Sequence, residues 1–199
     1  FLTLYMQTVL HYSPIQTGVA YLPLTGGFIV ASGIASQLFA RVGTKPVVVV
    51  GAVIAASGLY WLSRIPLHGA YVSDILPGIL VTSLGAGCVF VGLTTAANAG
   101  VDESRAGLAA GLLNTGQQLG TALGLAILSA LATARANSLL DGGHDTIVQA
   151  ASAGYARGLL GGAAFVLAGG VIALLGARNT RQTAAVVEDE AQPALDTAA

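Results

Sequence analysis

The chain has 199 residues, of which 54% are hydrophobic and 9% are charged, and its formal net charge is -1. A soluble domain carries about 25% charged residues, so this chain lacks the charge that would cover a surface in water. The balanced charge also gives no reason to expect a nucleic-acid partner.

Long uncharged runs define the expected helices, because one bilayer span needs about 20 apolar residues. Backbone groups in lipid must be hydrogen-bonded internally, and the runs lack the alternation of barrel strands, so helices are expected. Pro14, inside "HYSPIQTG", lacks an amide donor and separates the first two of them. We predict a partial span at residues 1–10 and complete spans at about 17–39, 46–63, 75–99, 106–134 and 158–177.

Short polar links join these spans, with a longer link from Arg135 to Arg157. Residues 1–178 are therefore expected to form one all-α membrane bundle whose first helix is truncated. After Arg178 the sequence becomes small, polar and acidic, and residues 179–199 are predicted to be a disordered cytoplasmic tail. That orientation places more Lys and Arg residues on the cytoplasmic side than on the other, as the positive-inside rule favours.

The span at 106–134 contains an unusual stretch, "GLLNTGQQLGTALG", that carries amides inside an uncharged run. At 100° per residue, this helix separates into three stripes. The polar stripe consists of Asn114, Gln117, Gln118 and Thr121, with Gly107 and Gly111 on the same side. The glycine stripe consists of Gly116, Gly120 and Gly124, and the leucine stripe of Leu108, Leu112, Leu119 and Leu123.

Each stripe suggests a different neighbour. Leucines suit lipid, and glycines allow another helix to approach closely, so all five glycines are predicted to serve helix packing. An amide without a partner in hydrocarbon costs several kcal/mol, so the polar stripe faces another helix or a watery cavity. Interhelical hydrogen bonding and the lining of a solute pathway both remain open, and we favour the pathway. Tyr5 and Gln7 are further pathway candidates, although tyrosines also anchor helices at the membrane interface.

Two segments resemble a known family. "FLTLYMQTVLHYSPIQTGVAYLP" at 1–23 resembles part of the major facilitator superfamily, in its fourteen-helix drug/proton antiporter branch of bacteria. "ESRAGLAAGLLNTGQQLGTALGLAIL" at 103–128 is similar to the penultimate helix of that branch. The resemblance covers about residues 1–178. It implies the C-terminal six-helix half of a multi-pass transporter in the bacterial inner membrane, which works by alternating access.

A third segment, "SQLFARVGTKP" at 36–46, is similar to the cytoplasmic loop motif of the superfamily. Arg41, Gly43 and Lys45 match the motif, whereas Ser36 and Ala40 replace its leading Gly and its Asp. The resemblance implies a loop that braces helix ends and gates the conformational change. A purely structural basic turn is the alternative.

The expected function is proton-coupled efflux of amphipathic drugs, as in antibiotic resistance, with the lipid bilayer, a small-molecule substrate, protons and a missing N-terminal half as partners. No acid or base lies within a span, so the coupling carboxylate is expected in that missing part. A metabolite or sugar permease of the same superfamily, an integral membrane enzyme and a non-transporting scaffold or sensor are alternatives. The lone Cys88 and three scattered histidines form no catalytic or metal-ligand cluster, so no enzyme activity, cofactor or metal is expected.

Overall fold

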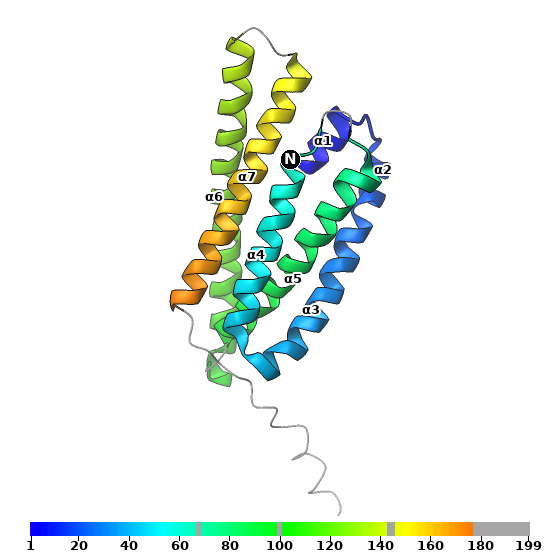
Figure 1. The fold of residues 1–199 in the computed structure, drawn as a ribbon. Coiled ribbons are helices and arrows are strands. Elements are labelled where there is room, and N and C mark those ends of the chain that lie inside the picture. The colour runs from blue at the N-terminus through cyan, green and yellow to red at the C-terminus, as the bar shows by residue number, and fades with distance from the viewer. Residues whose placement is uncertain (67–68, 99–100, 143–145, 177–199) are drawn as a thin grey trace, which may run out of the picture.

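The computed structural model describes residues 1–66, 69–98, 101–142 and 146–176. These residues form helices and turns and contain no strand (Figure 1). Five of the helices are long and apolar enough to cross a membrane, which confirms the predicted all-α membrane class. In chain order the elements are α1 (Leu2–Thr8), α2 (Pro14–Ala20), α3 (Leu22–Val42), α4 (Thr44–Leu62), η1 (Tyr71–Ile75), α5 (Leu76–Asn98), η2 (Glu103–Arg105), α6 (Ala106–Asp141) and α7 (Ile147–Gly176).

A capping box starts the first complete span. The Ser13 hydroxyl accepts a hydrogen bond from the Gln16 amide at 3.2 Å, and the Gln16 side chain accepts one from the Ser13 amide at 2.9 Å. Pro14 then occupies the first helical position, where its missing N–H costs nothing. The break at Tyr21, between α2 and α3, precedes Pro23, which has no N–H to bond to the preceding turn.

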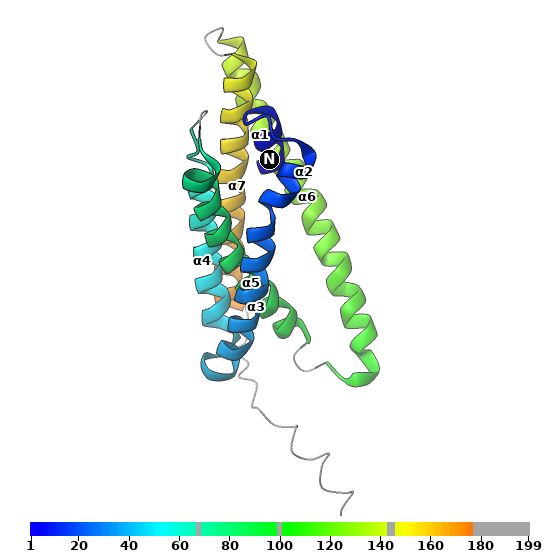
Figure 2. The ribbon, with the colours of Figure 1, turned by 90° about the vertical axis from the view of Figure 1, so that its right-hand side faces the viewer.

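The helices α3, α4 and α5 pack side by side, and α7 packs on α4 and carries α6 (Figures 1 and 2). Glycines bring the backbones of α4 and α5 together. A Cβ atom added at Gly51 of α4 would lie 2.7 Å from Cys88 Cβ and 3.0 Å from the Gly85 carbonyl oxygen of α5. Close backbone approach through small residues is the usual way in which membrane helices gain dispersion energy.

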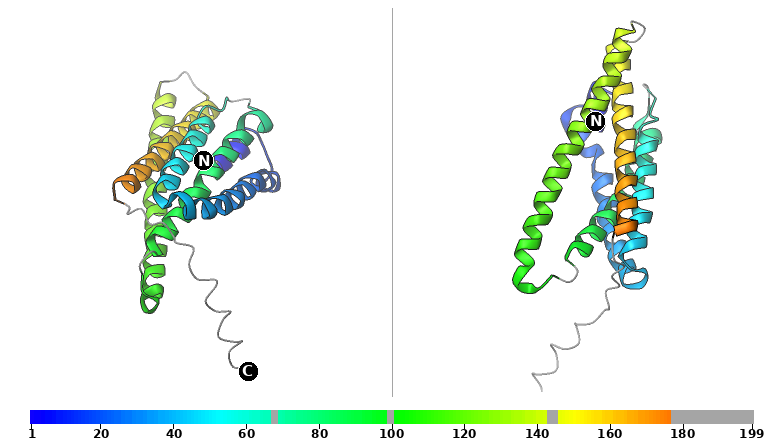
Figure 3. Two further views of the ribbon diagram at one scale, coloured as in Figure 1. Left: turned by 60° about the horizontal axis from the view of Figure 1, so that its bottom comes forward. Right: turned by 90° about the vertical axis from the view of Figure 1, so that its left-hand side faces the viewer.

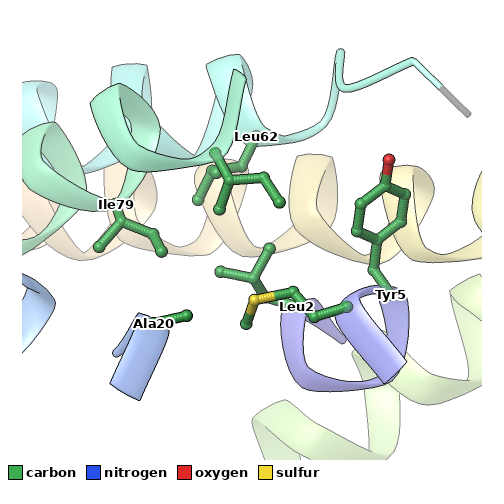
Figure 4. Packing of buried hydrophobic residues seen from close by; sticks show 7 residues of the cluster. Leu2, Tyr5, Ala20, Leu62 and Ile79 are labelled. Carbon is green, nitrogen blue, oxygen red and sulfur yellow. The ribbon is translucent and has the colours of Figure 1, made fainter. Parts of the chain in front are cut away.

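The short helix α1 is held against one end of this bundle, which we call the α1 end. A buried apolar cluster fixes it there (Figure 4). The Tyr5 hydroxyl adds a hydrogen bond of 2.6 Å to the Pro66 carbonyl oxygen, just after α4. The buried members of the cluster are Leu2, Tyr5, Met6, Ala20, Leu62, Ile75 and Ile79.

The helices α6 and α7 are longer than the spans predicted for them. The stretch between Arg135 and Arg157, expected as a polar link, is helical up to Asp141 and again from Ile147. A second capping box starts α7, in which the Thr146 amide donates to the side chain of Gln149 at 2.9 Å. The pattern of charges does not indicate this helix start, whereas the Thr-x-x-Gln pattern does. The predicted tail at 179–199 lies outside the described residues.

Successive spanning helices run in opposite directions, as a bundle that crosses a membrane repeatedly requires (Figure 1). Arg41 and Lys45 flank the α3–α4 turn at the end opposite α1, and Arg105 precedes α6 at that same end. Arg64 follows α4 at the α1 end. The bundle therefore places Arg41, Lys45 and Arg105 at one end and Arg64 at the other, and the assignment of the Arg41 end to the cytoplasm stays a prediction.

Candidate functional site

The helix α6 packs on the rest of the molecule along only part of its length. Its later turns lie on α7, where a Cβ at Gly154 would come within 2.6 Å of the Ala132 carbonyl oxygen. Its first half diverges from α3 and α5, which leaves a space between them (Figures 2 and 3). The half that diverges is the half that carries the polar and glycine stripes.

Among the described residues, the glycines of α6 face open space. A Cβ added at any of the five would meet no heavy atom within 4 Å, namely at Gly107, Gly111, Gly116, Gly120 and Gly124. The helix contact expected there is therefore not made within the described part of the chain, and it stays a prediction about a segment outside it.

The space between α6 and the α3–α4–α5 unit contains a cavity of about 720 Å³, which we call the amide cleft. Gln117, Gly120 and Thr121 line it from α6. Phe28 of α3 and Phe90 of α5 line the opposite wall, with their ring centroids 5.7 Å apart. The volume lies within the range of about 300–1,000 Å³ that is typical of small-molecule sites. Mainly apolar walls with a few polar groups are also typical of such sites.

The polar groups in the amide cleft differ in whether their hydrogen-bond donors are already used within the protein. The Thr121 hydroxyl donates to the Gln117 carbonyl oxygen at 2.8 Å, and the Thr82 hydroxyl donates to the Gly78 carbonyl oxygen at 2.7 Å. Both hydroxyl protons are therefore used within their own helices. The side-chain amide of Gln117, with two donors and an acceptor, has no hydrogen-bond partner among the described residues. Gln117 is thus the side chain in the cleft best suited to orient a bound molecule.

A second cavity of about 620 Å³ adjoins the amide cleft and shares Leu59, Gly120 and Val166 with it. We call this second cavity the apolar cleft, because the described residues that line it include no polar side chain. Gly124 of α6 and Phe1, the first residue of the chain, both lie in its wall. An entirely apolar hollow of this kind suits hydrocarbon or another helix better than a polar solute.

Only two of the four residues in the predicted polar stripe line a cleft. Gln117 and Thr121 line the amide cleft, whereas Asn114 and Gln118 are exposed and line neither cleft. The helical wheel explains the division, because Asn114 lies about 60° and Gln118 about 100° from Gln117 around the axis of α6. A four-residue polar stripe is wider than the wall of one cleft, so only part of it lines the amide cleft, and its role as a solute pathway stays a prediction.

Tyr5 and Gln7 do not reach either cleft. Tyr5 is 5% exposed, and its hydroxyl is already bonded to the Pro66 carbonyl oxygen. This geometry shows Tyr5 packed and hydrogen-bonded at the α1 end, and its role in a solute pathway stays a prediction. Gln7 is half-buried on the same short helix.

The sequence does not reveal which residues form the wall of the amide cleft opposite α6. Phe28, Leu59 and Phe90 are ordinary apolar residues in apolar helices, so nothing in the local pattern distinguishes them. One signal was available on α5, where Thr82 and Leu93 lie at the two ends of a series with a spacing of three or four residues. Such a spacing defines one helix face, but a sequence alone does not say which face looks onto a cavity.

The turn that matches the loop motif consists of one residue between two helices. Gly43 ends α3 and begins α4 with φ 89° and ψ 167°, and its amide donates to the Phe39 carbonyl oxygen at 3.0 Å. Only glycine adopts this backbone conformation readily. Arg41 is exposed and Lys45 is half-buried on either side. Gly43 thus has a structural reason for its place in the motif.

A cluster of three or more His, Cys, Asp or Glu residues that could bind a metal ion does not occur in the part of the chain that the structure describes.

Comparison with known proteins agrees with this geometry. A family model described as the Major Facilitator Superfamily matches residues 1–125, more than half of the chain. The chain belongs to the Major Facilitator Superfamily. It is thus a multi-pass membrane protein of a transporter family, as the resemblance implied.

Curated relatives carry names from antibiotic resistance and export. The chain is 39% identical to the puromycin resistance protein pur8 of Streptomyces alboniger over 67% of its own length and 27% of the relative. It is 37% identical to the cephamycin export protein CmcT of Amycolatopsis lactamdurans, over 64% of the chain and 26% of the relative. It is 33% identical to the tetracenomycin C resistance and export protein of Streptomyces glaucescens, over 68% and 25%. The chain spans about a quarter of the length of these relatives.

Proposed function

We propose that the chain is the C-terminal part of a secondary active transporter that exports amphipathic, drug-like molecules by alternating access, coupled to protons. The observation that carries the proposal is the amide cleft, a large and mainly apolar cavity with one unpaired amide on its wall. The relatives named for drug resistance and export support the direction of transport. The proposal assigns transport to the chain and no enzymatic reaction.

The cleft suits molecules with an aromatic or alicyclic body and a few polar groups. Phe28 and Phe90 offer apolar ring surfaces to the body of the solute. The Gln117 amide can donate to or accept from a polar group on the solute, and water takes that place when the cleft is empty. Loose selection of this kind, by apolar area with one or two hydrogen bonds, allows chemically different solutes to bind.

We assign proton coupling to a part of the transporter outside this chain. Among the described residues, no acidic or basic side chain lines the amide cleft or the apolar cleft. A proton site within a membrane normally requires a carboxylate or another ionisable group. The missing N-terminal part is the expected location of that group, since the named relatives are about four times as long as the segment matched here.

The apolar cleft is the proposed place of the upstream part of the truncated first helix, the part that precedes Phe1. Phe1 lies in its wall and packs against Tyr155 of α7, with ring centroids 6.2 Å apart. A chain entering at Phe1 would pass beside Gly120 and Gly124, which have open space above them. The upstream part of the helix would give the glycine stripe the contact predicted for it and would leave the amide cleft to the solute.

The test is efflux by the complete transporter in a bacterial host that lacks its own major exporters. We expect the transporter to lower the accumulation of a lipophilic dye, and a protonophore to abolish this effect. Gln117→Leu should reduce the initial efflux rate by about five- to tenfold, the equivalent of one hydrogen bond of roughly 1–1.5 kcal/mol. Normal efflux by a well-expressed Gln117→Leu protein would exclude the amide cleft as the pathway.

Gln118→Leu is the matched control on the same helix. The structure predicts a small effect, because Gln118 lines neither cleft, whereas the polar stripe in the sequence predicts an effect equal to that of Gln117→Leu. If both variants lowered thermal stability without changing the efflux of the molecules that remain folded, interhelical hydrogen bonding would replace the pathway as the role of the stripe.

A metabolite or sugar permease is the alternative, and counterflow with labelled solutes distinguishes it. Purified transporter in liposomes loaded with a sugar should show no accelerated uptake of labelled sugar if the proposal holds. Rapid sugar counterflow together with no dye transport would assign the amide cleft to a metabolite instead.

A further inference from the structure

A separate groove lies at the α1 end of the bundle, between the last turns of α4 and the η1 turn. Its volume is about 460 Å³, and Tyr60, Trp61, Arg64 and Asp74 line it. A cation, an acid and two aromatic side chains therefore share one hollow that is distinct from both clefts. We call it the headgroup groove.

The headgroup groove opens onto the outer face of α4. Val50 and Val53 are 56% and 55% exposed, and with Ser57 and Tyr60 they form a ridge with a spacing of three or four residues that ends at Arg64. An apolar ridge on a spanning helix faces acyl chains. Tyrosine and tryptophan at the end of a span mark the membrane interface, so the groove lies at the depth of lipid headgroups.

Arg64 has donors to spare in this groove. Its guanidinium lies 5.0 Å from the centroid of the Tyr60 ring, and one of its nitrogens donates to the Tyr60 hydroxyl. A guanidinium has five N–H donors in a planar fork that fits phosphate oxygens. The other donors have no partner among the described residues. Contact with the Tyr60 ring fixes the direction of the fork and leaves it open to the groove.

Asp74 is held in place but remains partly unsatisfied. One carboxylate oxygen, Oδ2, accepts hydrogen bonds from the Ala70 amide at 2.8 Å and the Ser73 hydroxyl at 3.0 Å. The Trp61 indole N–H donates to the Asp74 carbonyl oxygen at 3.2 Å and fixes the backbone as well. The second oxygen, Oδ1, accepts no hydrogen bond within the described residues.

Arg64 and Asp74 line the same groove, both lie in the described part of the chain, and no salt bridge joins them. Each charge is therefore left to face a partner of its own. A ligand that complements the groove needs a negative group for Arg64 and a nearby positive group with N–H donors for Asp74. It also needs an apolar tail for the ridge of α4.

We propose that the headgroup groove binds a phospholipid with a phosphate and a primary ammonium, as in phosphatidylethanolamine. The phosphate lies at the Arg64 guanidinium, and the ammonium donates to Asp74 Oδ1. An anionic lipid such as phosphatidylglycerol satisfies Arg64 but leaves Asp74 facing hydroxyl groups and negative charge. Phosphatidylcholine has the same net charge as phosphatidylethanolamine but no N–H donor, because its nitrogen carries three methyl groups.

The test is lipid retention by the complete transporter, measured by native mass spectrometry after extraction from vesicles of equal parts dioleoyl-phosphatidylethanolamine, -phosphatidylglycerol and -phosphatidylcholine. We expect the wild type to retain phosphatidylethanolamine preferentially. Arg64→Gln should lower that retention by about tenfold, the effect of losing one charge-assisted hydrogen bond. Asp74→Asn should lower it as well and should shift the preference toward phosphatidylglycerol.

Arg135→Gln is the matched control, since Arg135 is an exposed arginine of α6 outside the groove. The Arg135→Gln protein should retain as much phosphatidylethanolamine as the wild type. Arg64→Lys keeps the positive charge but loses the planar fork, so its retention should lie between those of the wild type and Arg64→Gln, and it replaces Arg64→Gln in the test if that variant folds poorly. Equal retention of the three lipids by the wild type, or an Asp74→Asn protein with an unchanged preference, would overturn the proposal.

Discussion

The close approach of α4 and α5 at Gly51 leads to a quantitative prediction for Gly51→Ala. The added Cβ would lie 2.7 Å from Cys88 Cβ and 3.0 Å from a backbone oxygen, that of Gly85. Carbon atoms in favourable contact are about 3.5–4.0 Å apart, so the two helices must separate by roughly 1 Å. Overpacking of this kind costs about 1–3 kcal/mol. The higher helix propensity of alanine returns at most about 1 kcal/mol.

We therefore expect Gly51→Ala to destabilise the transporter by about 1–2 kcal/mol. The assay is thermal unfolding of the purified, detergent-solubilised protein followed by loss of the monodisperse chromatographic peak. The scale of about 2–4 °C per kcal/mol predicts a fall in Tm of roughly 2–8 °C. Gly169→Ala on α7 is the control, because a Cβ there meets no heavy atom within 4 Å. A Tm of Gly51→Ala at or above that of Gly169→Ala would refute the packing argument.

Three further substitutions test other parts of the fold by the same thermal assay. Gly43→Ala should lower stability by about 1–3 kcal/mol, because alanine avoids a φ of 89°; an unchanged Tm would show that the turn can relax. Tyr5→Phe should cost about 0.5–1.5 kcal/mol through loss of the hydrogen bond to Pro66, and a neutral result would mean that water replaces the hydroxyl. Ser13→Ala removes a helix cap and should cost about 0.5–2 kcal/mol, whereas Ser13→Thr should retain most of the stability.

The number and order of the spanning helices could be read from the sequence, because the requirement for about 20 uncharged residues is a property of the bilayer and applies to any helix in it. The ends of the helices were harder to predict from the sequence. Charge placed the end of α6 near Arg135, but helix continues to Asp141 because a helix need not stop where the lipid does. The start of α7 is set by the capping pair of Thr146 and Gln149, which is visible in the sequence as a Thr-x-x-Gln pattern but not in the distribution of charge.

The candidate site, like the helices, could be predicted from the sequence only in part. Helical periodicity placed Gln117 and Thr121 together on one face of α6, and they line one cleft. Periodicity could not find Phe28 or Phe90, since the two rings come from helices whose mutual rotation depends on packing. Nor could it separate Gln117 from Gln118, because a wheel gives angles around one axis and not the direction of the neighbouring helices.

The divergence of α6 has a mechanical consequence. The glycine contacts fasten α4 to α5, and the single-residue turn at Gly43 ties α3 to α4, so these three helices resist sliding past one another. The opening turns of α6 have no such fastening, and swinging them inward or outward breaks few contacts within the chain. Close packing thus holds α3, α4 and α5 together, whereas the position of the first half of α6, and with it the width of the amide cleft, rests on few contacts among the described residues.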